Sequence, residues 1–538
     1  MTSIQTHHAL EASDTTPAIA TWLTSTDHKI VGRLYIGSGF IGLLGGLVLA
    51  VLVAVERINA DSYQILSDAT SVQVLAVARN LLTFGGAVPL LFGLMLAIVP
   101  LQLGSRGIAF PRLATGSFWM WLTGLGMMVA SIIGNGGPGG GNADLVDLYL
   151  AAFIVMLLGL AMAATSLVVT ILTSRSPGMG ILRAPLLTWS ALVTSVSVLL
   201  TVPVLIGTTA YVYVDHRYAR LGFGGNKGVN TWIGWALSQP FTFLLAIPAL
   251  GMVLDAVPVL SRNRLAQRPA AFVAVGLVGV AAVSAVTQTT VTLPWGGDSF
   301  LSGLGTKIAD LLPFALLNGV PVLGLLGVLA LSLLTLKEGK PMIAAPLAFS
   351  LVGLLGVVLG AASHILGGIE DAGLRGTIYE TGSYVAVTFG SIIVAFGAVC
   401  FWGPKLWGRR ISDKAALPLV LLALGAIGLG SLPYMIAGFA DQPAGLVNGF
   451  DYSGPQALWN VLTAMGFSLM LLLAGAFIAL ALKSFTSGEA AGDDPWDGTT
   501  LEWATSSPPP SDNFVDIMVV NSATPLADLK ATSNGKDA

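Results

Sequence analysis

Apolar segments alternate with short polar segments along almost the whole chain. From Leu34 onward, apolar runs of about 17–25 residues recur, and each can cross a hydrocarbon core about 30 Å thick at about 1.5 Å per residue. The pattern therefore predicts an all-α polytopic membrane protein. Its twelve predicted transmembrane helices cover residues 34–55, 80–102, 117–134, 148–173, 186–213, 231–259, 270–293, 312–336, 342–366, 378–403, 416–438 and 456–482.

These helices divide the chain into three regions. Residues 1–33 are polar and lack a basic stretch followed by an apolar one, so we expect a cytoplasmic tail and not a signal peptide. Residues 34–484 hold the twelve-helix membrane domain. Residues 485–538 are polar again and are expected to form a second cytoplasmic tail.

The loop charges predict which way the chain crosses the membrane. With the N-terminus inside, 18 Lys and Arg residues fall in the inner segments and 7 in the outer ones, which accounts for all 25. Inner loops of membrane proteins carry the excess of positive charge. We therefore expect a multi-pass protein of the plasma membrane with both termini in the cytoplasm.

Composition excludes several classes of protein. Of the 538 residues 54% are hydrophobic and 10% are charged, with a mean hydropathy of +0.81, whereas soluble domains carry about 25% charged residues. The net charge of -3 gives no sign of a nucleic-acid partner. Cys400 is the single cysteine, so an internal disulfide and an iron-sulfur cluster held by several thiolates are both excluded.

The chain lacks the common motifs of soluble catalysis. It contains no P-loop and no HExxH motif. The string GNGGPGGGN at residues 134–142 resembles a phosphate loop, but no strand precedes it and no lysine follows, so we interpret it as a flexible outer loop. Histidine is scarce in the chain and occurs only at His7, His8, His28, His216 and His364.

Several loop strings resemble subunit I of cytochrome c oxidase, a haem-copper oxidase. They are TWLTSTDHK at 21–29, VPLQLGSRGIAFPRL at 99–113, SRSPGM at 174–179, FWGPKLWGR at 401–409 and DDPWDGTTLEWATSSPPPSDNF at 493–514. Their order and their placement between the predicted spans fit the family along almost the whole chain. The resemblance implies twelve helices, two haems, a copper ion, and partner subunits II and III.

The resemblance also shows what this chain has lost. In the family, six histidines on four helices hold a low-spin haem, a high-spin haem and copper, and such metals need strong donors such as imidazole. The string SQPFTF at residues 238–243 stands where the family has Gly-His-Pro-Glu-Val-Tyr, and TFGG at 83–86 stands where it has Thr-Met-His-Gly. The six ligand positions fall on Gly85, Gln239, Gln288, Thr289, Ser383 and Val385.

The supporting groups of the family are missing as well. The proton-admitting aspartate, the proton-relaying glutamate, the cross-linked tyrosine, the lysine of the second proton path and the arginine pair at the haem propionates all have counterparts of another chemistry. These positions fall on Gly107, Phe241, Phe243, Leu325, Tyr434 and Met435. We expect no bound cofactor, and we expect Phe241, Phe243 and Tyr384 to fill part of the space that haem occupies in the family.

A few polar residues within the predicted spans need their own interpretation. His364 is either a polar residue near the outer end of the ninth span or a single haem or metal ligand. Glu380 is either a functional carboxylate or an interfacial residue that pairs with Arg375 or a neighbouring helix. We expect Asp255 to meet Arg262 or Arg264, and Cys400 to pack as a small apolar side chain.

Three functions are compatible with this sequence. The first is a catalytically inactive, metal-free subunit that keeps a structural or assembly role in an oxidase-like respiratory complex with subunits resembling oxidase II and III. The second is a redox-active oxidase subunit with one unconventionally ligated haem. The third is an ion-conducting or transport derivative that uses Glu380 and other polar positions.

Overall fold

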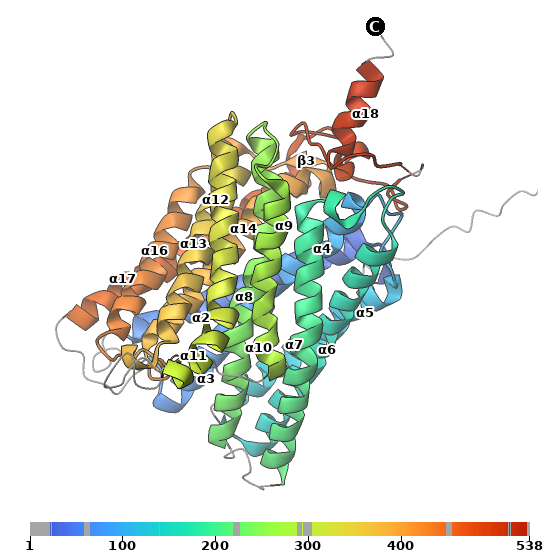
Figure 1. The fold of residues 1–538 in the computed structure, drawn as a ribbon. Coiled ribbons are helices and arrows are strands. Elements are labelled where there is room, and N and C mark those ends of the chain that lie inside the picture. Colours follow the sequence, from blue (N-terminus) through green and yellow to red (C-terminus); the bar gives the residue numbers. More distant parts are fainter. Residues whose placement is uncertain are drawn as a thin grey trace, which may run out of the picture.

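The fold was analysed in a computed structural model of the chain. It describes residue 22 and residues 24–58, 65–138, 140–218, 226–287, 293, 304–447, 455–514, 516 and 518–534, with the backbone alone at 68–69, 226–241, 287, 304–307, 310 and 532–534. Helices dominate the described residues, and they run side by side as one elongated bundle (Figure 1).

Among the described residues, twelve helical spans are long and apolar enough to cross a membrane, as predicted. They cover His28–Glu56, Thr70–Gln102, Pro111–Ile133, Ala143–Thr173, Leu186–Arg217, Thr242–Leu260, Arg268–Val286, Leu311–Glu338, Ala345–Gly367, Ile378–Trp407, Asp413–Gly438 and Pro455–Ser487. The helices that build them are α2 (His28–Glu56), α3 (Asp68–Asn80), the π-helix η1 (Leu81–Ala87), α4 (Val88–Gln102), α5 (Pro111–Ile133), α6 (Ala143–Thr173), α7 (Leu186–Arg217), α8 (Asn226–Leu260), α9 (Arg268–Gly279), η3 (Val280–Ala282), α10 (Val283–Thr287), α11 (Leu304–Phe314), η4 (Ala315–Gly319), α12 (Val320–Glu338), α13 (Ala345–Gly367), α14 (Ile378–Trp407), α15 (Asp413–Ala416), α16 (Leu419–Gly438) and α17 (Pro455–Ser487).

The remaining described elements are short and lie at the two ends of the bundle. They are the turns of 3-10 helix η2 (Ile181–Arg183), η5 (Glu370–Ala372) and η6 (Leu501–Ala504), the helix α18 (Pro525–Asn534), and the strands β1 (Gly136–Gly137), β2 (Gly140–Gly141), β3 (Arg409–Arg410) and β4 (Glu489–Ala490). Strands β1 and β2 pair antiparallel. The glycine-rich loop that we predicted to be flexible therefore has a paired backbone on either side of Gly139.

Two spans lie at the centre of the bundle. The most apolar stretches of Thr70–Gln102 and Ile378–Trp407 are completely buried inside the chain, whereas those of the other spans are one third to five sixths buried. The second span begins ten residues earlier than predicted, because Ser67 accepts a hydrogen bond from the Thr70 amide and starts helix α3 among polar residues. The resemblance places three of the haem ligands on these two central spans.

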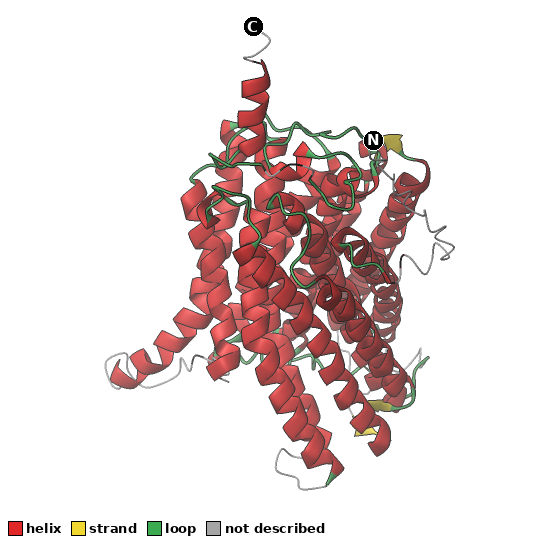
Figure 2. Cartoon of the chain, turned by 90° about the vertical axis from the view of Figure 1, so that its right-hand side faces the viewer, coloured by secondary structure: helices red, strands yellow, loops and turns green. Residues whose placement is uncertain are grey.

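Figure 2 shows the C-terminal helix at one end of the bundle. The beginning of α2 lies at the same end, because Lys29 donates to Ser511 and Asn513 of the C-terminal segment. We call this end the tail face. Helix α2 begins at His28, earlier than the predicted boundary at residue 34, because the Asp27 side chain accepts from the Lys29 amide and caps the helix. Strand β4, from the C-terminal segment, pairs with β3 at the end of α14. The predicted C-terminal tail is thus folded against the membrane domain.

Candidate functional site

The first ligand position lies in a distorted part of the second span. Residues 81–87 form the π-helix η1, and Gly85 is buried within it. The Trp121 indole Nε1 donates to the carbonyl of Phe84 at 3.1 Å, which satisfies a backbone acceptor beside the distortion. Gly85 offers no donor atom from a side chain. A Cβ atom at Gly42 of α2 would overlap the backbone of Gly85, so the two helices are in direct contact here.

Helix α14 carries the two haem-ligand positions that the resemblance places in the tenth span. Ser383 is buried and its hydroxyl donates to the Tyr379 carbonyl at 3.3 Å, and Val385 is buried. Between these positions, the Tyr384 hydroxyl lies 2.7 Å from the Thr83 hydroxyl of η1. The Tyr384 hydroxyl also donates to the Arg79 carbonyl at 3.3 Å. Side chains thus join the two central spans directly beside the former ligand positions.

The sixth span is described only in part. The side chains of Gln239 and Phe241 lie outside the described residues, as do Gln288 and Thr289 entirely. Phe243 is buried, and its ring meets the imidazole of His364 edge to face with 6.0 Å between ring centres. His364 therefore lies against Phe243, the position of the family's tyrosine. The sequence had indicated only that His364 is near the outer end of the ninth span.

The donor chemistry of these positions does not fit haem or copper ligation in the family's manner. Among the described residues, no group of three or more His, Cys, Asp and Glu side chains comes together. Gly85 and Val385 carry no donor atom, and the Ser383 hydroxyl is a weak ligand already engaged with backbone. The one imidazole in this region is His364, whose buried Nε2 has no hydrogen-bond partner among the described residues.

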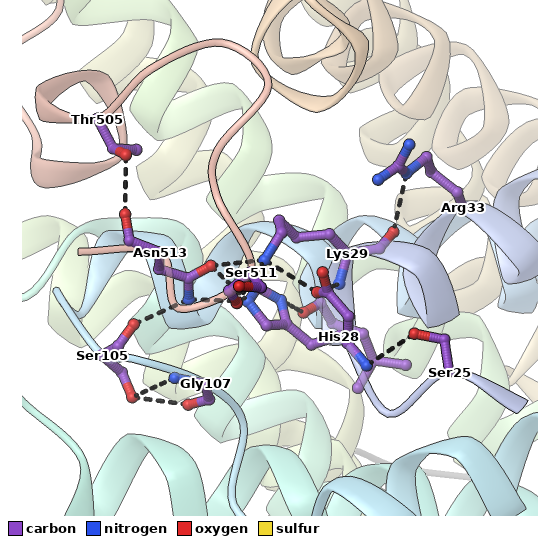
Figure 3. A network of polar contacts seen from close by, with 11 residues as sticks. Ser25, His28, Lys29, Arg33, Ser105, Gly107, Thr505, Ser511 and Asn513 are labelled. Carbon is purple, nitrogen blue, oxygen red and sulfur yellow. Dashed lines mark hydrogen bonds and ion pairs between the residues drawn. The ribbon is translucent and has the colours of Figure 1, made fainter. Parts of the chain in front are cut away.

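The position of the family's proton-admitting aspartate lies in a turn on the tail face. Gly107 donates its amide to the Ser105 hydroxyl at 3.3 Å, and that hydroxyl donates to the Gly107 carbonyl at 2.6 Å. The Asn513 amide of the C-terminal segment donates to the Ser105 carbonyl at 2.8 Å (Figure 3). On its other side Asn513 accepts from the Lys29 ammonium at 2.8 Å and contacts His28 Nε2. The C-terminal segment therefore covers this turn.

The lysine position of the second proton path is apolar and packed. Leu325 on α12 is fully buried. Asp255 near the end of α8 does not pair with Arg262 or Arg264, contrary to our prediction. Its carboxylate instead accepts from the amides of Leu186 and Leu187 at 2.9 and 3.1 Å. The first amides of a helix have no acceptor within the helix. The Asp255 carboxylate accepts from two such amides of α7, and this contact is stronger than a pair with an exposed arginine would be.

A second buried carboxylate lies beside Asp255. The Gln102 amide donates both to Asp255 at 2.8 Å and to Glu502 of η6 at 3.2 Å. Trp402 Nε1 also donates to Glu502, at 3.4 Å. Burial, followed by the charge of Asp255, raises the pKa of Glu502 to about 7. Sequence reasoning missed this pair because Gln102, Asp255 and Glu502 lie on three distant segments.

A buried cation lies beside the position where the resemblance places the family's propionate-binding arginine pair. Tyr434 and Met435 stand where the family has its arginine pair, and both are buried. Arg57, at the end of α2, is 1% exposed and donates to the Tyr434 hydroxyl at 3.2 Å. It also donates to the carbonyls of Ala444 at 2.8 Å and Leu446 at 3.3 Å. Arg57 is one of the seven Lys and Arg residues that the charge count assigns to the outer segments. Its place directly after Glu56 at the end of an apolar run is the signal in the sequence for this role.

The remaining polar candidates are separated from one another. Glu380 is exposed in the first turn of α14, and the described residues include no ion pair between it and Arg375. A carboxylate in the first turn of a helix is stabilised by the helix dipole instead. Cys400 is buried and free, as predicted. These residues form no common site with His364.

Comparison with known proteins identifies the family of this bundle. The sequence profile described as "Cytochrome C and Quinol oxidase polypeptide I" matches residues 30–478. A putative cytochrome c oxidase subunit 1-beta of Streptomyces coelicolor is 29% identical over 95% of this chain and 91% of its own. Cytochrome c oxidase subunit 1 of Bacillus subtilis is 28% identical over 94% of this chain and 82% of its own.

Two further comparisons bear on assembly and fold. A haem-copper oxidase subunit I+III of Aeropyrum pernix is 28% identical over 96% of this chain and 64% of its own. A solved structure of a haem-copper terminal oxidase dimer superposes with a TM-score of 0.67 at 14% identity, covering 94% of this chain and 89% of that one. The profile match extends over most of the membrane domain, and the chain therefore belongs to the cytochrome c and quinol oxidase polypeptide I family.

Proposed function

We propose that this chain is a catalytically inactive, metal-free member of its family, with a structural or assembly role in an oxidase-like respiratory membrane complex. Its scaffold is complete in twelve spans. The positions at which the family holds two haems and copper carry groups that are poor ligands. In this proposal the chain keeps the helical scaffold of the family and lacks its metal ligands.

One observation carries this proposal. The hydroxyls of Thr83 and Tyr384 lie 2.7 Å apart and join η1 to α14, the two central spans that hold haem ligands in the family. Gly42 and Gly85 bring α2 against the same part of η1. A haem between η1 and α14 would have to displace the contact between these two hydroxyls, and Gly85 would give its iron no axial ligand.

Location and partners follow from the same proposal. We propose that the chain lies in the plasma membrane with both termini in the cytoplasm, and the bias of Lys and Arg supports this orientation. Partners resembling oxidase subunits II and III would then contact the outer loops and the membrane surface of the bundle. The Aeropyrum pernix relative, whose name joins subunits I and III, supports a partner of the second kind.

An absorption spectrum with metal analysis tests the proposal. We expect the full chain, purified in mild detergent, to show no reduced-minus-oxidised haem band and no stoichiometric copper. The Bacillus subtilis subunit 1 prepared in the same host is the control, because it shows whether haem and copper were supplied. One haem per chain would contradict the proposal. Mass spectrometry of the same preparation would test the partners, and recovery of a lone chain in several detergents would remove the assembly role.

A second function is favoured by His364. Its buried Nε2 has no hydrogen-bond partner among the described residues, so it is free to ligate one metal centre. A redox subunit with a single unconventionally ligated haem would lose its haem band in His364→Phe and keep it in His216→Phe. Persistence of the band in His364→Phe would exclude this second function.

A further inference from the structure

A large cleft opens on the tail face between the C-terminal segment and the loop that joins α8 to α9. Its volume is about 1100 Å³, slightly above the ~300–1,000 Å³ that is typical of small-molecule sites in proteins. Leu265 and Met342 give it apolar surface, and Trp496 contributes an aromatic wall. None of the positions assigned to the family's metals lines this cleft.

The inner part of the cleft carries negative charge and an unused acceptor. Glu502 lines it and is 1% exposed. Its Oε1 accepts from Gln102 and Trp402, whereas its Oε2 is buried and has no partner among the described residues. A buried acceptor without a donor costs about 1–3 kcal/mol. The carboxylate of Asp255, held by the same Gln102 amide, adds a second negative charge beside it.

The loop side of the cleft carries positive charge. Arg262, Arg264 and Arg268 line it. Arg268 donates to the Ala184 carbonyl at 2.6 Å, so its guanidinium is held in place. Arg262 and Arg264 are exposed, and within the described part of the chain their side chains form no ion pair or hydrogen bond. Guanidinium groups bind phosphate oxygens in a fork of parallel hydrogen bonds.

We propose that this cleft binds an ammonium group linked to a phosphate, as in phosphoethanolamine, with the ammonium donating to Glu502 and the phosphate contacting Arg262 and Arg264. The negative inner part and the positive loop side match the two charges of such a molecule. An ammonium with N–H bonds satisfies Glu502 Oε2, whereas a quaternary choline has no N–H bond to donate. The source is either the headgroup of phosphatidylethanolamine or free phosphoethanolamine.

Native mass spectrometry of the full chain tests this. The chain is titrated separately with phosphatidylethanolamine, phosphatidylcholine and phosphatidylglycerol of identical acyl chains, and with free phosphoethanolamine and free phosphocholine. We expect at least about tenfold tighter binding of the ethanolamine compound than of its choline counterpart in the lipid pair, the free pair or both. Selectivity in the lipid pair assigns the source to the membrane, and selectivity in the free pair alone assigns it to the cytosol. Equal binding of ethanolamine and choline compounds in both pairs overturns the proposal.

Three variants locate the binding. Glu502→Gln should abolish the preference for ethanolamine over choline, because the amide presents no charge to the ammonium. The double variant Arg262→Ala, Arg264→Ala alters exposed side chains only and should weaken the binding of the ethanolamine compound at least about fivefold. The control Arg106→Ala removes an exposed arginine that does not line the cleft, and it should bind as the unmodified chain does. Full ethanolamine selectivity and affinity in the arginine double variant would overturn the proposed site.

Discussion

Gly42 of α2 lies with its backbone directly against the backbone of Gly85 in η1. A methyl group at Gly42 would overlap the Gly85 peptide, which belongs to a buried π-helix and cannot move aside without disturbing its neighbours. We therefore expect Gly42→Ala to destabilise the bundle by about 1–3 kcal/mol.

Thermal unfolding of the purified variants measures this effect. The matched control is Gly37→Ala on the same helix, where an added Cβ meets nothing within 4 Å. The control should unfold at or above the temperature of the unmodified chain. Equal unfolding temperatures for the Gly42 and Gly37 variants would show that the two helices are not packed as described.

The hydroxyl pair of Thr83 and Tyr384 should contribute measurable stability. Thr83→Val keeps the shape of the side chain and removes the hydroxyl, and Tyr384→Phe removes the other partner. Thr83→Val is expected to cost about 1 kcal/mol, and Tyr384→Phe should cost more because it also removes the bond to the Arg79 carbonyl. The double variant should cost little more than Tyr384→Phe alone, because both single variants remove the bond between the two hydroxyls. Unfolding measurements on the four chains give the coupling energy. If the stability losses of Thr83→Val and Tyr384→Phe simply add in the double variant, the two hydroxyls do not form a hydrogen bond.

Arg57 should be important for stability despite its place at the end of a span. Arg57→Met leaves the carbonyls of Ala444 and Leu446 without their donor, so we expect a loss of about 2 kcal/mol and faster proteolysis of the segment around these residues. Arg375→Met is the control, because Arg375 is exposed and the described residues give it no ion pair. Similar proteolysis of both variants would refute this role for Arg57.

Glu502 should make the stability of the chain depend on pH. Its pKa is about 7 in the folded chain and near the ordinary 4.5 when unfolded, so the folded state holds the proton more tightly. Its contribution to stability is full below about pH 4.5 and is lost as pH rises to about 7, a change of up to about 3 kcal/mol. Glu502→Gln should flatten the unfolding temperature over this range. A profile with the same slope in the variant would assign the dependence to another group.

Lys405 should hold the C-terminal segment against the bundle. Its buried ammonium donates to the carbonyls of Asp493 at 2.9 Å and Thr505 at 2.6 Å, and it lies over the ring of Trp503. Lys405→Met should therefore increase hydrogen exchange in residues 493–514 at least about tenfold. Lys414→Met changes an exposed lysine on the same face and should leave this exchange unchanged. Unaltered exchange in the first variant would show that the segment is held by other contacts.

The sequence predicted the number of spans well and their contacts poorly. Apolar runs determine where helices cross a membrane, so twelve spans could be counted from Leu34 onward. The same runs do not determine which residues face each other. Arg57 and Tyr434 are 377 positions apart, and no local sequence pattern predicts their contact.

At the candidate site, too, the sequence predicted residue identities but not the contacts between them. The resemblance to the family identified Gly85, Ser383 and Val385 as positions without imidazoles, because that conclusion needs only residue identities. It could not show that η1 is a π-helix or that Tyr384 reaches Thr83. Asp255 was assigned to nearby arginines by proximity in sequence, whereas the start of α7 offered two backbone amides that only the fold brings close.

The contacts of the C-terminal segment also set an order of events during synthesis. Lys29 in the first span donates to Ser511 and Asn513, 482 and 484 residues later, and Lys405 in the tenth span donates to the same segment. This segment is synthesised after all twelve described spans. Its docking surface exists only once the first and tenth spans stand together in the membrane. Residues 493–514 can therefore dock fully only on a bundle in which both spans are already in place.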